Sequence, residues 1–151
     1  ISQPYTVAFQ TELLDIQPLD KVLEVGTGSG YQAAVLMEMG ARVYTIERQK
    51  GLYLKVQMQL PKMGYKPSFF YGDGYQGLPT YSPFDKILIT AAAPEIPPAL
   101  VEQLKIGGIL VLPIGGPGSQ VMTRVEKTGK GEYSAREHGF FVFVPMLKGR
   151  E

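Results

Sequence analysis

The sequence predicts an α/β protein built on a doubly wound sheet that is mostly parallel. Two observations favour this fold: short apolar strands alternate with helical segments, and a glycine-rich turn directly follows the first strand. A third observation concerns the end of the chain. After residues 115–118, which are rich in glycine, the pattern changes to two hairpin-like strands. This change predicts an antiparallel C-terminal hairpin region.

The first half of the chain divides into three helices and three strands. Pro4 lies in the first turn of the first helix, where proline is well tolerated, and residues 18–20 break the chain before the first strand. Gly40 ends the second helix, and Pro61 is expected to disturb the last turn of the third. The predicted helices are residues 4–16, 31–39 and 50–63, and the predicted strands are residues 22–25, 42–46 and 68–71.

The second half begins with a fourth strand at residues 86–90, which is nearly all apolar, as a parallel strand buried on both faces should be. A short helix at residues 97–105 is expected to end at Gly107 and Gly108, before a fifth strand at residues 109–114. The two hairpin strands are predicted at residues 121–127 and 140–146, around a polar turn at residues 128–131. The pattern does not decide their order in the sheet.

The glycine-rich turn is the most informative stretch of the sequence. Gly26, Gly28 and Gly30 allow a tight turn and let a ligand approach the backbone without meeting a Cβ atom. In a doubly wound sheet this turn lies at the carboxyl end of a central strand, where nucleotides bind. Glu47 closes the next strand, where its carboxylate is placed to accept hydrogen bonds from both hydroxyls of a ribose. Together these features predict an adenosine-type cofactor in a Rossmann-like fold.

The spacing of the turn indicates which cofactor. The dinucleotide fingerprint is G-x-G-x-x-G, whereas this chain reads G-x-G-x-G and has Tyr31 where the last glycine should fall. Glu24, in the strand before the turn, would repel a pyrophosphate but tolerate a cationic group. S-adenosylmethionine, with its ammonium and sulfonium groups, fits. The alternative is that Glu24 caps local amides and that Glu47 is an ordinary solvated carboxylate.

A third acidic residue follows a strand end at Asp73, between two glycines. Asp73 is predicted to accept a hydrogen bond from the adenine amine, although Asp-Gly is also a common turn dipeptide. We therefore expect that the ends of these strands and the glycine-rich turn together form one cofactor site. Its predicted residues are Glu24, Gly26, Thr27, Gly28, Ser29, Glu47, Asp73, Gly74 and Thr90.

Several segments resemble the protein-L-isoaspartate O-methyltransferase family. They are residues 1–8 (ISQPYTVA), 22–32, 44–48 (YTIER), 72–75 (GDGY), 90–94 (TAAAP), 104–108 and 143–146 (FVPM). The Ser-x-Pro opening and the TAAAP segment are more specific than the glycine-rich loop, and the resemblance runs nearly end to end. The chain departs from the family in one respect, because a leading helical segment of some tens of residues is absent.

The resemblance implies an activity. S-adenosylmethionine would give its methyl group to the α-carboxylate of an L-isoaspartyl residue in a damaged protein or peptide, leaving S-adenosylhomocysteine. It also implies that Ser2 is a catalytic residue, although Ser2 could equally cap the helix that begins near Pro4. By the same resemblance Ala91, Ala92, Val144 and Pro145 are assigned to the peptide-binding groove, and an ordinary edge strand is the alternative for Val144 and Pro145.

The residues after the fourth strand agree with a carboxylate acceptor. The small residues of the segment 90–94 supply neither a base nor a metal ligand, but are expected to leave backbone N–H and C=O groups accessible. A nucleophile that is already ionised at neutral pH needs no base. Catalysis would then be mainly positioning and desolvation. The alternative is that the alanines only pack a tight turn.

Composition bounds the remaining possibilities. The 151 residues suit a single domain, and a net charge of +1 indicates neither a nucleic-acid partner nor a membrane surface. The chain has no cysteine and one histidine, so we expect no metal site. We also expect a cytoplasmic monomer. Two other functions stay open: a methyltransferase for a small molecule or RNA, and an S-adenosylmethionine-binding relic without activity.

Overall fold

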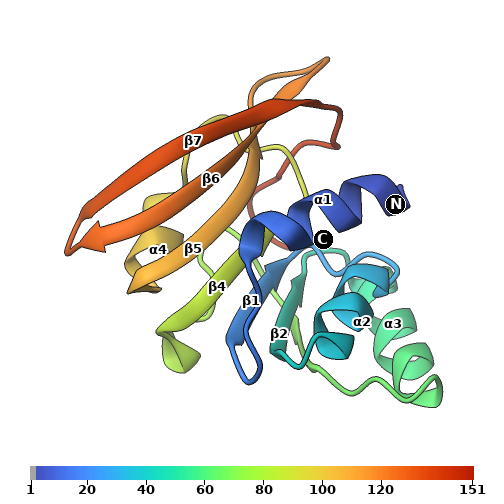
Figure 1. Cartoon of the computed structure of the whole chain (residues 1–151). Helices are drawn as coiled ribbons and strands as arrows, with labels where there is room; N and C mark the ends of the chain where they lie inside the picture. The colour runs from blue at the N-terminus through green and yellow to red at the C-terminus, as the bar shows by residue number, and fades with distance from the viewer. Residues whose placement is uncertain (1–2) are drawn as a thin grey trace.

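The computed structural model describes residues 3–151, which form one seven-stranded sheet flanked by helices (Figure 1). The strand order is β3-β2-β1-β4-β5-β6-β7. Strands β1 to β5 pair in parallel, whereas β6 and β7 are antiparallel, which confirms the predicted fold class. The strands are β1 (Lys21–Val25), β2 (Arg42–Glu47), β3 (Ser68–Tyr71), β4 (Phe84–Ile89), β5 (Leu104–Ile114), β6 (Gln120–Gly129) and β7 (Glu132–Phe141).

The helices cover the two faces of the sheet. Three helices, α1 (Pro4–Leu14), α2 (Tyr31–Glu38) and α3 (Lys50–Lys62), contribute Leu14, Leu36 and Leu60 to one apolar core. The short helix α4 (Pro98–Glu102) packs on the opposite face, in the second core; a 3₁₀ helix (Pro79–Tyr81) precedes β4. Among the described residues, no helix is long and apolar enough to cross a membrane.

The order of the strands reverses direction at β1, between β2 and β4. Val25, the last residue of β1, pairs with Ile46 on one side and Ile89 on the other. In sheets of this kind, the crevice beyond the carboxyl ends of such central strands is where ligands bind. The fold therefore places the glycine-rich turn at this crevice.

The prediction for residues 97–108 is wrong in its boundaries. Helix α4 ends at Glu102, and β5 begins at Leu104, which pairs with Phe84. The register then shifts before Ile109 pairs with Lys86. Gly107, with φ of +87°, lies in this irregular part of β5, so the glycines form a kink in a strand and do not end a helix.

The second hairpin strand is also misplaced in the prediction. It runs from Glu132 to Phe141, and the turn between β6 and β7 contains only residues 130 and 131. Because β7 is an edge strand with exposed side chains along most of its length, it lacks the apolar pattern that marks a buried strand. The hydrophobic residues 142–146 follow the strand instead of forming it.

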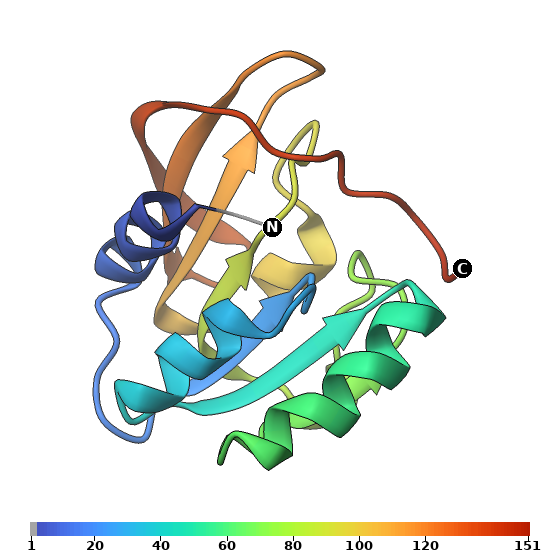
Figure 2. The same ribbon diagram turned by 90° about the vertical axis from the view of Figure 1, so that its right-hand side faces the viewer.

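The segment after β7 crosses the carboxyl edge of the sheet. Figure 2 shows it in red, running from β7 over the sheet toward the beginning of α3. The Ala92 N–H donates to the Val144 carbonyl, and the Ala92 carbonyl accepts from the Met146 N–H. The donor–acceptor distance is 2.7 Å in both hydrogen bonds. Tyr75 Oη donates to the Met146 carbonyl at 3.1 Å. We call residues 142–147 the strap.

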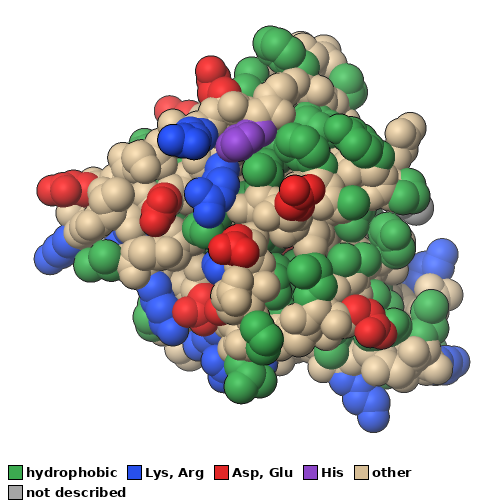
Figure 3. Space-filling view, viewed as in Figure 1, with side chains coloured by type: hydrophobic (Ala, Val, Ile, Leu, Met, Phe, Trp, Pro, Cys, Tyr) green, Lys and Arg blue, Asp and Glu red, His purple; other side chains and the backbone are tan. Residues whose placement is uncertain are grey.

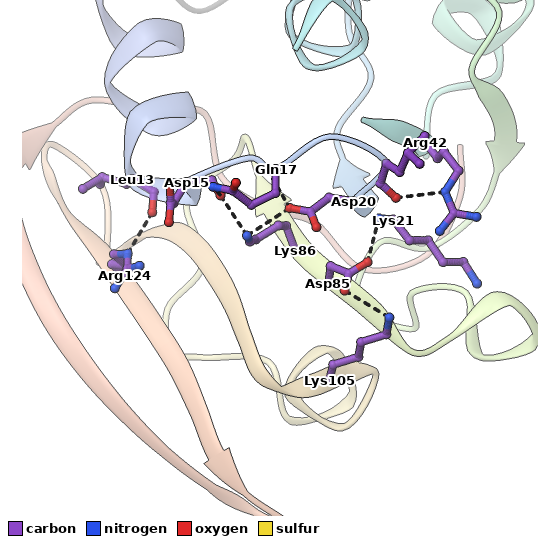
Figure 4. Close-up of polar contacts among 11 residues, drawn as sticks. Leu13, Asp15, Gln17, Asp20, Lys21, Arg42, Asp85, Lys86, Lys105 and Arg124 are labelled. Carbon is purple, nitrogen blue, oxygen red and sulfur yellow. Dashed lines mark hydrogen bonds and ion pairs between the residues drawn. The ribbon is translucent and has the colours of Figure 1, made fainter. Parts of the chain in front are cut away.

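Polar contacts tie together the opposite, amino edge of the sheet (Figure 4). Lys86 Nζ lies 3.0 Å from Asp20 Oδ2 and donates to the Asp15 carbonyl at 2.9 Å. Asp85 accepts from the Lys21 N–H and pairs with Lys105. These contacts fix the connection between α1 and β1 against β4, and so hold the C-terminal end of α1 at this edge of the sheet.

Candidate active site

A cavity of about 610 Å³ opens at the carboxyl ends of β1, β2 and β4. It brings together most of the residues that the sequence assigned to a cofactor or substrate site. Those lining it are Glu24, Gly26, Thr27, Gly28, Ser29, Glu47, Gly74, Thr90, Ala91, Val144 and Pro145. The strap lines one side, and α3 contributes Leu52, Lys55, Val56 and Gln59.

The glycine-rich turn is held against β4 by close packing. Gly26 has φ of +100°, and a Cβ atom there would lie 2.5 Å from Thr90 Oγ1. That hydroxyl lies 2.8 Å from the Gly26 carbonyl oxygen and 3.0 Å from the Val25 carbonyl oxygen. Glycine is therefore required at position 26 by both conformation and space.

Glu24 is a buried carboxyl group that faces the cavity. Its side chain is fully buried, and Oε1 accepts a hydrogen bond from Thr45 Oγ1 at 2.7 Å. Burial raises the pKa of Glu24 from 4.5 to about 8; the Thr45 hydrogen bond opposes this, and the Glu47 charge adds to it. Oε2 has no hydrogen-bond partner among residues 3–151. A buried polar atom without a partner indicates a ligand or water.

Glu47 is held by the backbone around it. Oε1 accepts from the Gly28 N–H and Oε2 accepts from the Gln49 N–H, both at 2.9 Å. Each carboxylate oxygen can accept a further hydrogen bond, so these two bonds orient the group and still leave it able to bind a ligand. Glu47 therefore links the glycine-rich turn to the end of β2 at the cavity wall.

Two predicted residues that the structure describes, Asp73 and Ala92, are not among those that line the cavity. Asp73 Oδ1 accepts from the Tyr75 N–H at 2.9 Å, which is the local turn that its Asp-Gly sequence also allowed. Ala92 pairs with the strap, so the expectation that its backbone groups stay accessible is wrong. Ser2 lies outside the described residues.

Two residues of the site were not found from the sequence pattern. Thr45 does not line the cavity itself, but it pairs with Glu24 across β1 and β2, and its hydroxyl lies 2.6 Å from Thr27 Oγ1. Gln32, in the first turn of α2, lines the cavity. A polar residue inside an otherwise apolar strand was the available signal for Thr45. Gln32 carried no such signal, because its neighbour in space is on α1.

Carboxyl groups are the candidate general bases of the cavity near neutral pH. Its charged lining side chains are Glu24, Glu47, Arg48 and Lys55, and none of its described lining residues is Asp, His or Cys. Within the part of the chain that the structure describes, no cluster of three or more potential metal ligands occurs.

A model of the protein-L-isoaspartate(D-aspartate) O-methyltransferase family matches residues 1–151. The chain belongs to this family. Named protein-L-isoaspartate O-methyltransferases of Flavobacterium psychrophilum and Christiangramia forsetii are 56% and 54% identical to it over 151 residues. Each comparison covers 99% of this chain and 70% of the relative.

Solved structures agree with the family assignment. A protein-L-isoaspartate O-methyltransferase superposes with a TM-score of 0.88 at 28% identity, over 96% of this chain and 47% of that one. A Plasmodium falciparum protein of the same enzyme class, in complex with S-adenosyl-L-homocysteine, gives 0.78 at 26% identity, over 98% and 76%. This chain thus spans less than half of the first of these structures.

The family indicates S-adenosylmethionine as the cofactor, and the residues present fit it. Glu24 Oε2 is a buried acceptor without a partner at the cavity wall, suited to a cationic group. The backbone at Gly28 leaves open space where a Cβ atom would stand. A dinucleotide pyrophosphate would instead bring negative charge toward two carboxyl groups.

Proposed function

We propose that this chain transfers a methyl group from S-adenosylmethionine to the α-carboxylate of L-isoaspartyl residues in damaged proteins and peptides. The observation that carries the proposal is the family match over residues 1–151. The cavity supports it independently, because its shape and charges suit a cationic adenosyl cofactor. The acceptor class rests on the family alone.

Glu24 and Glu47 divide the recognition of the cofactor between them. Glu24 receives the cationic amino acid end, where its unpartnered oxygen and full burial make an opposite charge most favourable. Glu47, at the end of β2, is placed to accept from ribose hydroxyls. When bound, the cofactor supplies a methyl group on a sulfonium that a nucleophile can displace.

The acceptor side of the site works by positioning. Ala91, Val144 and Pro145 line the cavity with small or apolar side chains that offer the reacting carboxylate no competing side-chain hydrogen bond. An α-carboxylate is ionised at neutral pH, so the step needs no proton transfer. Holding the two reactants in line supplies the acceleration. Ser2 remains a proposed catalytic residue on the resemblance alone.

The test is transfer of labelled methyl from S-adenosylmethionine to a peptide containing L-isoaspartate, beside the same peptide with normal aspartate. The proposal expects base-labile label on the isoaspartyl peptide only, because a methyl ester hydrolyses in base. Equal labelling of both peptides would contradict the acceptor. Cofactor binding without transfer to either peptide would instead identify a binding relic or another acceptor.

Two finer properties are also proposals. We infer that the protein acts as a monomer in the cytoplasm, and its lack of cysteine suits a reducing compartment. Sedimentation of the purified chain and fractionation of the source cells test these two statements.

A further inference from the structure

Two unpartnered acceptors line the same cavity. Glu24 Oε2 and Gln32 Oε1 are buried oxygens without a hydrogen-bond partner among the described residues. Gln10 Oε1 shares this property but is not among the lining residues. An unpartnered buried oxygen is costly, because it has lost its hydrogen bonds to water without gaining a partner in the protein. Two of them on residues that line the same cavity indicate a ligand that brings hydrogen-bond donors.

A threonine orients each of these side chains. Thr45 donates to Glu24 Oε1 and so leaves Oε2 free. Gln32 Nε2 donates to Thr11 Oγ1 at 2.9 Å, and Thr11 Oγ1 donates to the Val7 carbonyl at 2.7 Å. Because the amide nitrogen of Gln32 is committed to α1, its oxygen is the atom left without a partner. Helix α1 therefore sets the orientation of a side chain on α2.

The donor that fits both oxygens is a primary ammonium group. It has three N–H donors, no acceptor, and a charge opposite to that of an ionised Glu24. A carboxylate or phosphate on the ligand would only add hydrogen-bond acceptors, whereas Glu24 Oε2 and Gln32 Oε1 need donors. Of the other charged lining groups, Glu47 adds negative charge, whereas Arg48 and Lys55 are the cations; neither cation bonds to Glu24 or Gln32.

We propose that Gln32 and Glu24 together bind the ammonium group of the cofactor, and that Thr11 is a positioning residue for Gln32. The proposal rests on the proposed function for the identity of the cofactor. It gives Gln32 a binding role and makes α1, through Thr11, part of the cofactor site.

The experiment measures calorimetric affinity for two ligands, S-adenosyl-L-homocysteine and its analogue without the α-amino group. In Gln32→Met we expect affinity for S-adenosyl-L-homocysteine to fall about tenfold, as for a lost hydrogen bond to a charged group. Affinity for the analogue should change less than twofold. Gln17→Met, on an exposed loop, is the matched control and should change neither.

Thr11→Val should also lower the affinity for S-adenosyl-L-homocysteine but not for the analogue. Thr11→Ser should retain the affinity of the unmodified chain, because serine keeps the hydroxyl group. Equal losses for the two ligands would overturn the proposal, since the amide would then serve packing or an ordered water. Unchanged affinity in Gln32→Met, with its fold verified by circular dichroism, would overturn it too. The readout is separate from catalysis: failure to methylate an isoaspartyl peptide would defeat the proposed function while the selective loss still supports this site.

Discussion

At the scale of single residues, Glu24 couples the cavity to the stability of the fold. Its pKa rises from 4.5 to about 8 on burial, so between these pH values the folded chain binds a proton that the unfolded chain has lost. Its contribution to stability therefore falls as pH rises through this range. A cation at Oε2 would favour the ionised form and reverse this loss.

Glu24→Gln tests this linkage. The amide cannot ionise, so we expect the variant to unfold at a higher temperature than the unmodified chain near pH 8. The difference should shrink as the pH approaches 4.5, where Glu24 is protonated in both states. Thermal unfolding of both chains across this range, without ligand, is the measurement. A difference that is constant with pH would show that Glu24 is ionised in the empty chain.

Gly26 provides a second prediction at this scale. Gly26→Ala forces φ of +100° on alanine and brings its Cβ to 2.5 Å from Thr90 Oγ1. We expect a loss of about 2–4 kcal/mol in the free energy of unfolding. Gly28→Ala, in the same turn with open space around it, should lose only about 1 kcal/mol. Urea unfolding measures both, and equal losses would contradict the packing argument.

At the scale of elements, a buried lysine joins β6 to the end of α4. Lys127 Nζ donates to the carbonyls of Val101 and Leu104, each at 2.9 Å, and its side chain is largely buried. These carbonyls lie at and just beyond the C-terminus of α4, where they lack helical partners and attract a cation.

Lys127→Met removes that cation from a buried position. We expect the free energy of unfolding to fall by about 1–3 kcal/mol, because the carbonyls lose a charged donor. Lys130→Met, at the exposed hairpin turn, should change it by less than about 0.5 kcal/mol. Denaturant titration of the two variants checks this, and similar effects would mean that Lys127 acts only through its apolar stem.

The elements also show how far sequence reasoning reaches. Strands β1 to β4 and helices α1 to α3 were predicted to within a few residues, because apolar runs and glycine turns mark them directly. The boundary of α4 and β5 was wrong, because the register of β5 against β4, not local pattern, sets where that strand begins. Strand β7 was misplaced because backbone pairing with β6, rather than apolar burial, defines an edge strand.

The same distinction holds for the site. Glu24, Glu47 and the glycine turn could be predicted because each lies at a strand end. Gln32 and Thr11 could not, since their contact depends on how α1 packs on α2. Helix α1 is itself placed by tertiary packing: Phe9 lies 5.1 Å from Phe141, centroid to centroid.

At the scale of the whole molecule, the strap joins the last strand to the cavity. It begins in an exposed apolar stretch: Phe140, near the end of β7, and Val142, the first residue of the strap, are each 77% exposed. Figure 3 shows apolar side chains gathered where the end of β7 and the start of α1 approach each other. The strap then forms backbone hydrogen bonds with Ala92, and its Met146 carbonyl accepts a hydrogen bond from the Tyr75 hydroxyl. The Phe143 N–H also donates to Gln120 Oε1 at 2.7 Å, so the strap forms a wall of the cavity that these hydrogen bonds hold in place.

Tyr75→Phe loosens that wall without removing the ring. Loss of the hydrogen bond to the Met146 carbonyl should raise the dissociation rate of S-adenosyl-L-homocysteine about fivefold. Tyr133→Phe, on the exposed strand β7, is the control and should leave the rate unchanged. Stopped-flow displacement measures these rates. An unchanged rate in Tyr75→Phe would mean that the strap does not limit ligand release.

We propose that the site methylates a carboxylate that is already ionised, without a general base. The most direct measurement is the pH dependence of methyl transfer to the isoaspartyl peptide in a single turnover at saturating cofactor. The acceptor carboxylate is ionised between about pH 6 and 8 and saturating cofactor removes the pH dependence of binding, so we predict a rate that is flat over this range. A rate that climbs about tenfold per pH unit across that range would reveal a titrating base and contradict the claim.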